Sequence, residues 1–212
     1  MSKLVLRIIS EGLVGRMLVG ALSITRVAAQ WLMDKNYIRN FQTMLAWNSL
    51  YYIIMGVSYI IIMLWPDILG RTGLWGLIIL CVTRVNELVF AFYGDALPKQ
   101  GSVKKRLPLG KRDRIILLTL AYIEIIFQFG IIYVAIDGLY AGEKPFHAKF
   151  EAAWDAIFLS GATITTLGAG DFYPTKPCAR FAVLYEALIG ILFIALGLAA
   201  YMSGSEKSEG AP

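Results

Sequence analysis

Four long apolar stretches limit what this chain can fold into. They lie near residues 44–65, 74–93, 115–136 and 179–202, and each approaches or exceeds the roughly 20 residues that a helix needs to cross a bilayer. Hydrophobic residues make up 58% of the 212 residues and charged residues only 17%, whereas soluble domains are about a quarter charged. We therefore predict an all-α membrane protein with four transmembrane helices.

The segment between the second and third stretches is strongly basic. It holds a single acid, Asp113, against Lys99, Lys104, Lys105, Arg106, Lys111, Arg112 and Arg114. By the positive-inside rule this loop and both termini face the cytoplasm of a multi-pass cell-membrane protein, and residues 137–178 lie outside. We read the net charge of +5 as this topology signal and not as nucleic-acid binding. A site for anionic lipid headgroups at residues 99–114 is the alternative.

A shorter apolar segment, residues 150–167, cannot cross the membrane. It fits a re-entrant helix, which is tolerated where protein or water surrounds it. The run that ends it, residues 163–171, reads Thr-Ile-Thr-Thr-Leu-Gly-Ala-Gly-Asp. Backbone angles that alternate between left- and right-handed turn successive carbonyls toward one axis. The left-handed angles are unstrained only in a residue without a Cβ, so we expect both Gly168 and Gly170 to adopt angles that other residues cannot adopt without strain. Such a column replaces the water around a cation, as in a selectivity filter.

Residues 165–171 resemble the Thr-Thr-Val-Gly-Tyr-Gly-Asp signature of potassium channels. Residues 172–175, 179–181 and 186–190 (Phe-Tyr-Pro-Thr, Ala-Arg-Phe and Glu-Ala-Leu-Ile-Gly) are similar to the pore module of bacterial channels with two transmembrane helices. The resemblance covers roughly residues 114–202. It implies a homotetramer, in which each chain supplies one loop, and permeant K⁺ in place of any cofactor.

The filter assignment follows from this resemblance. The coordinating carbonyls belong to Thr166, Leu167, Gly168, Ala169 and Gly170, with the Thr166 hydroxyl at the cytoplasmic end and Asp171 at the outer mouth, where its charge concentrates cations. The expected parts are an interfacial amphipathic segment (1–40), an accessory two-helix transmembrane unit (41–98), a basic cytoplasmic linker (99–113), the pore module (114–202) and a disordered tail (203–212). Whether residues 1–32 lie on the membrane or cross it stays open.

Ala169 stands where the family has an aromatic residue. In the family that ring packs into a cuff around the filter; here Phe158 and Leu159 hold the usual pore-helix positions, and Ala162 replaces a frequent acid. Selectivity should weaken if it depends on a rigid cavity, but less if it depends on the number and field strength of the carbonyls. A potassium-selective channel, a non-selective monovalent cation channel and a non-conducting regulatory subunit therefore remain alternatives.

Gly190 lies in the last stretch, close to the position of the family's inner-helix hinge. A bending role and close helix packing through Ala187, Gly190 and Gly197 are both open. Glu186, one turn earlier, must be paired or wetted inside a membrane. We expect it to be a structural partner behind the filter, and an ion site is the alternative.

Charged residues also interrupt the second and third stretches. Arg84 and Glu87 share a helix face, and counting from the helix ends places Glu124 at a similar depth. We predict an intramembrane polar network of Arg84, Glu87 and Glu124, with Glu186 as a further member, that ties the accessory helices to the pore module. A fixed ionic clip and a proton or ligand sensor are both possible.

The chain shows no motif for catalysis. Cys81 and Cys178 lie too far apart in the expected topology for a disulfide, His147 is the sole histidine, and no nucleophile elbow, phosphate loop or zinc motif occurs. We therefore expect a protein that is not an enzyme.

Overall fold

The computed structural model describes residues 49, 52–61, 69–96, 111–140, 142–168 and 170–202. Its labelled helices are α5 (Gly70–Ala96), α6 (Lys111–Leu139), α7 (Ala153–Ile164) and α8 (Pro177–Met202), and a further apolar helix covers Tyr52–Ile61. Within these residues β structure is limited to an isolated bridge between Phe146 and Pro174. The predicted all-helical class is confirmed for the described part of the chain.

Some predictions concern residues outside this set. The interfacial segment 1–40, residues 99–110 of the basic linker, the tail 203–212 and Ala169 all lie outside the described residues. The last three linker residues do not form a loop, because α6 begins at Lys111.

Among the described residues, three helices are long and apolar enough to cross a membrane. The apolar spans are Gly70–Phe92, Arg112–Leu139 and Pro177–Ala195, and they coincide with the second, third and fourth predicted stretches. The helices that carry them have 27, 29 and 26 residues, so at a rise of 1.5 Å they extend for about 40 Å, more than the ~30 Å hydrocarbon core. The 12 residues of α7 reach only about 18 Å and cannot cross.

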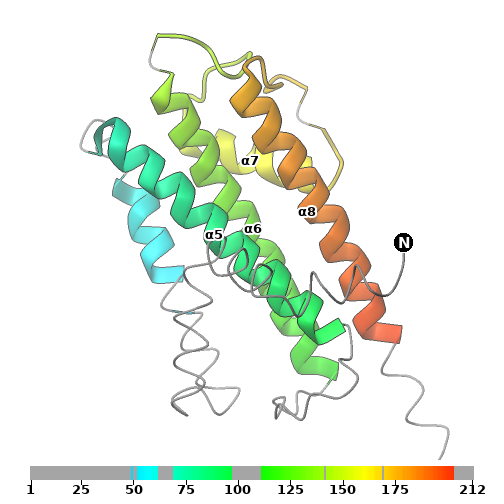
Figure 1. Cartoon of the computed structure of the whole chain (residues 1–212). Helices are drawn as coiled ribbons and strands as arrows, with labels where there is room; N and C mark the ends of the chain where they lie inside the picture. The colour runs from blue at the N-terminus through cyan, green and yellow to red at the C-terminus, as the bar shows by residue number, and fades with distance from the viewer. Residues whose placement is uncertain are drawn as a thin grey trace, which may run out of the picture.

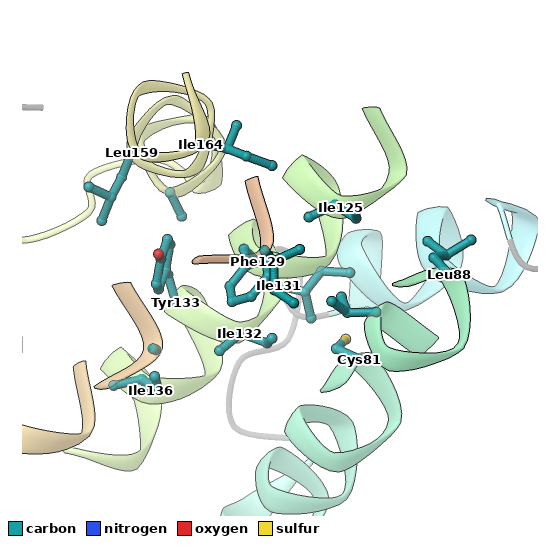
Figure 2. Close-up of a cluster of buried hydrophobic side chains, with 14 of the residues drawn as sticks. Cys81, Leu88, Ile125, Phe129, Ile131, Ile132, Tyr133, Ile136, Leu159 and Ile164 are labelled. Carbon is teal, nitrogen blue, oxygen red and sulfur yellow. The ribbon is translucent and has the colours of Figure 1, made fainter. Parts of the chain in front are cut away.

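The three long helices run side by side, and the short α7 lies between α6 and α8 (Figure 1). The central helix is α6, which packs against α5, α7 and α8. Figure 2 shows the resulting core: Cys81 and Leu88 of α5 lie on one side, Leu159 and Ile164 of α7 on the other, and Ile125, Phe129, Ile131, Ile132, Tyr133 and Ile136 of α6 between them. A helix that is apolar nearly all round is expected to be buried in this way.

Candidate functional site

The entry into α7 is fixed by a carboxylate. The Asp155 side chain accepts hydrogen bonds from the backbone N–H groups of Glu151 at 2.8 Å and Ala152 at 3.0 Å. These two donors precede the first turn and have no partner inside the helix, and an acid near a helix N-terminus is also favoured by the helix dipole. Asp155 therefore sets where α7 begins.

Two glycines let α7 sit close to its neighbours. A Cβ added at Gly130 of α6 would lie 3.0 Å from Ile157 Cγ1, and one added at Gly190 of α8 would lie 2.7 Å from Ile164 Cγ1 and 3.0 Å from the Ile164 carbonyl oxygen. Since α8 is a continuous helix from Pro177 to Met202, this geometry supports the packing interpretation of Gly190. A bending role for Gly190 stays a prediction.

The C-terminal end of α7 leads directly into residues 165–171, the predicted filter, which we call the filter loop. The Ile164 carbonyl accepts a hydrogen bond from the Tyr122 hydroxyl of α6 at 3.3 Å. The Thr165 hydroxyl donates to the Gly161 carbonyl at 2.6 Å, and the Gly168 amide donates to the Ala162 carbonyl at 3.1 Å. The loop is thus folded back against the last turn of α7, whose C-terminal carbonyls carry a partial negative charge.

The filter backbone alternates over residues 166–168. Thr166 has φ 59° and Gly168 has φ 77°, whereas Leu167 between them does not have a positive φ. The left-handed angle at Gly168 matches our expectation, but Gly170 is not among the positive-φ glycines of the described residues, so the expectation for Gly170 is wrong. The second left-handed residue of the loop is Thr166, in the turn at residues 165–166 that directly follows α7.

The assigned filter side chains and the outer mouth are open to the surroundings of a single chain. Thr166, Leu167, Gly168 and Gly170 are exposed, and so is Asp171. Leu167 reaches 76% exposure. The chain therefore presents this loop outward and does not enclose it.

An aromatic chain supports the outer end of the loop, and the sequence interpretation missed it. Ring contacts run from Tyr133 to Phe146 (5.4 Å between centroids), from Phe146 to Phe150 (4.9 Å) and from Phe150 to Phe172 (5.5 Å). Phe172 directly follows Asp171. The only sequence signal for this arrangement was the density of aromatic residues around α7. These residues follow neither a helical nor a strand periodicity, so their contacts could not be predicted.

Backbone hydrogen bonds join the same two segments. The His147 amide donates to the Tyr173 carbonyl at 3.0 Å, and the Thr175 amide donates to the Pro145 carbonyl at 2.8 Å. The His147 ring also stacks on Tyr173 at 4.5 Å. The residues before α7 and after the filter are therefore held together within one chain.

The predicted cuff positions differ in exposure. Leu159 and Ala162 are buried at 3%, but Phe158 is 52% exposed. Trp154, one helical turn before Phe158 and not singled out from the sequence, is 67% exposed on the same face. Phe158 and Trp154 are therefore available to a partner outside the chain, whereas Leu159 and Ala162 are not.

The polar network divides into two clusters. Arg84 of α5 donates from Nε to Glu124 Oε1 at 2.6 Å, from Nη2 to Glu124 Oε2 at 3.3 Å and from Nη1 to Glu87 Oε2 at 2.9 Å. All three residues are buried. Grouping Glu186 with them was wrong: Glu186 is fully buried elsewhere, where its carboxylate accepts hydrogen bonds from Tyr133 of α6 and Ser160 of α7. It lies behind α7, because α8 turns this face toward the pore helix and not toward α5.

The described residues contain no group of three or more histidine, cysteine, aspartate or glutamate side chains that could hold a metal ion. Cys81 and Cys178 are free thiols.

Comparison with known proteins gives one match, over the part of the chain from α6 to α8. Residues 116–203 match the family model described as an ion channel. We call this segment, which is similar to the ion channel family, the channel module. The channel module thus defined begins within α6 and covers less than half of the chain, so α5 and the Tyr52–Ile61 helix lie outside it. Comparisons with curated proteins and with solved structures give no match.

The resemblance stated from the sequence is confirmed by this match. The channel module contains α7, the filter loop and α8, together with nearly all of α6. The described part of the chain is all-helical, with three helices of membrane-crossing length and composition, and residues 116–203 are similar to ion channels.

Proposed function

We propose that this chain is one subunit of a homotetrameric, potassium-selective channel of the cell membrane, with both termini in the cytoplasm. Carbonyl oxygens of Thr166, Leu167, Gly168, Ala169 and Gly170 from four chains would replace the hydration shell of K⁺. Asp171 at the outer mouth would raise the local cation concentration. The channel would carry out no bond-making chemistry.

The observation that carries this proposal is the exposed, non-helical filter loop. Its backbone lies between helices of membrane-crossing length, and irregular backbone at membrane depth is tolerated only against protein or a water-filled space. Further copies of the chain around a wet axis satisfy that requirement.

The exposed face of α8 supports the same arrangement. Large apolar side chains repeat along it at intervals of three or four residues, and each is more than half exposed: Phe181, Leu184, Leu188, Ile191, Ile194 and Leu198. The exposed Trp154 and Phe158 of α7 add aromatic area beside the filter. Part of this surface would pack against neighbouring subunits, and the rest would face lipid.

Ala169 favours a second candidate, a non-selective monovalent cation channel, because the missing ring removes the family's brace around the filter. Both candidates require conduction. A non-conducting regulatory subunit would keep the fold without the flux.

Native mass spectrometry and ion flux together test the proposal. The purified chain should have the mass of a tetramer, and in sealed vesicles it should release K⁺ much faster than Na⁺. Equal rates for the two ions would favour the non-selective channel. A monomer or dimer that releases neither ion would refute conduction.

A further inference from the structure

Two adjacent residues of α8 bond to different neighbouring helices. The Tyr185 hydroxyl donates to Asn86 Oδ1 of α5 at 2.7 Å. The Glu186 carboxylate accepts from Tyr133 of α6 and Ser160 of α7. Tyr185 and Glu186 together therefore connect α8 to each of the other labelled helices.

Helix geometry makes this division possible. Successive residues of an α-helix point about 100° apart, so neighbours in sequence face different sides. Because α8 packs against α5 as well as against α6 and α7, one of the two side chains reaches α5 and the other reaches the pore helix. Their backbone is shared, so displacement of one side chain's anchor is transmitted to the other.

Packing fixes both side chains. The fully buried ring of Phe129 contacts Tyr185 at 5.7 Å and Tyr133 at 6.2 Å between centroids. Glu186 and Ser160 are both 0% exposed, so water cannot replace the bond between them. In such an interior a polar connection has few alternative arrangements.

The connection ends close to the filter. Ser160 lies one turn before Ile164, the last residue of α7, and the filter loop follows at once. Gly190, one turn after Glu186, meets the same Ile164. The position of the end of α7 thus depends on how α8 is held at residues 185–190.

We propose that the accessory helix α5 positions the filter through Tyr185 and Glu186, which act as positioning residues and do not touch the ion. The consequence for conduction rests on the proposed function, whereas the mechanical link does not. Since α5 lies outside the channel module, the accessory helices would control the pore at the level of the filter.

Amide hydrogen exchange of α7 tests the link in the full-length protein purified in detergent micelles. Tyr185→Phe removes only the hydroxyl and should speed the exchange of the α7 amides about 2- to 10-fold, the range expected for one lost hydrogen bond. In a Ser160→Ala background the same change should have a clearly smaller effect, because Glu186 no longer holds α7 and only the contact between Gly190 and Ile164 remains.

Tyr52→Phe is the matched control. Like Tyr185→Phe, it removes one tyrosine hydroxyl that bonds across helices. The Tyr52 hydroxyl lies in the accessory unit and donates to the Leu120 carbonyl of α6 at 3.4 Å, so its loss should leave α7 exchange unchanged. The inference is overturned if Tyr185→Phe leaves α7 exchange unchanged, or if it speeds exchange equally with and without Ser160.

The vesicle K⁺-to-Na⁺ release ratio adds a readout that a purely structural bond would not alter. It should fall in Tyr185→Phe and stay at the wild-type value in Tyr52→Phe; an unchanged ratio in Tyr185→Phe would refute control of the filter by α5. If wild-type vesicles release no ions, the proposed function fails, and hydrogen exchange still decides whether α5 positions α7.

Discussion

Arg84 of α5 holds both carboxylate oxygens of Glu124 of α6, with Nε 2.6 Å from Oε1 and Nη2 3.3 Å from Oε2. Arg84 is 2% exposed and Glu124 1% exposed, so this forked pair is shielded from solvent. It joins the accessory unit to the channel module at a point where a lone charge would be strongly unfavourable.

Replacing Arg84 alone should therefore destabilise the protein more than removing the whole cluster. Arg84→Leu leaves the Glu87 and Glu124 carboxylates without their cation, and we expect a loss of about 3–5 kcal/mol and poor assembly. Converting Arg84, Glu87 and Glu124 together to apolar residues of similar volume should restore assembly. Thermal melts and size-exclusion chromatography of the purified variants measure both effects.

An Arg84→Leu variant as stable as the wild type would contradict the buried-pair account. The triple variant also separates the clip from the sensor interpretation. If it assembles and its current no longer responds to pH, the cluster senses protons; an unchanged pH response leaves it a fixed clip.

The two filter glycines should differ in their tolerance of a side chain. Gly168→Ala places a Cβ on a residue with φ 77° and should abolish conduction while the tetramer forms. Gly170→Ala lacks this strain, and its Cβ would meet no atom of the described residues within 4 Å, so part of the flux should remain. Vesicle flux of the two variants at matched tetramer content measures this difference. Normal conduction by Gly168→Ala would disprove the assignment of Gly168 to the filter.

Gly190→Ala tests packing against bending. The added Cβ would lie 3.0 Å from a backbone carbonyl that cannot rotate away, so we expect a loss of about 1–3 kcal/mol in stability. Gly76→Ala in α5 is the matched control, because its Cβ meets nothing within 4 Å, and it should be stabilising by up to about 1 kcal/mol. A Gly190→Ala variant with unchanged melting and altered opening would instead support a hinge.

Restoring the filter aromatic should sharpen selectivity. Ala169→Tyr should raise the K⁺-to-Na⁺ permeability ratio if the missing ring is what weakens the filter, provided that the new side chain fits near Phe158. Bilayer recordings from variants that still form tetramers measure this ratio. An unchanged ratio would show that the carbonyls alone set selectivity.

The sequence predicted the long helices well, because span-length apolar runs and the basic linker are signals that do not depend on tertiary contacts. It also predicted that Arg84 and Glu124 lie at a similar depth, since depth follows from counting along straight helices. It could not name the partners of Glu186, because which side of α8 faces α7 is decided by packing around Gly190 and Phe129. It also could not predict the left-handed angle at Thr166, because threonine gives no sequence signal for such an angle.

The most direct test of the central claim is the reversal potential of the purified protein in a planar bilayer with unequal K⁺ and Na⁺ on the two sides. A potassium-selective filter predicts a reversal potential close to the K⁺ equilibrium potential, and the value should follow that potential as the K⁺ gradient is changed. A reversal potential that stays near zero while current flows would contradict potassium selectivity, and the absence of current from verified tetramers would contradict the channel itself.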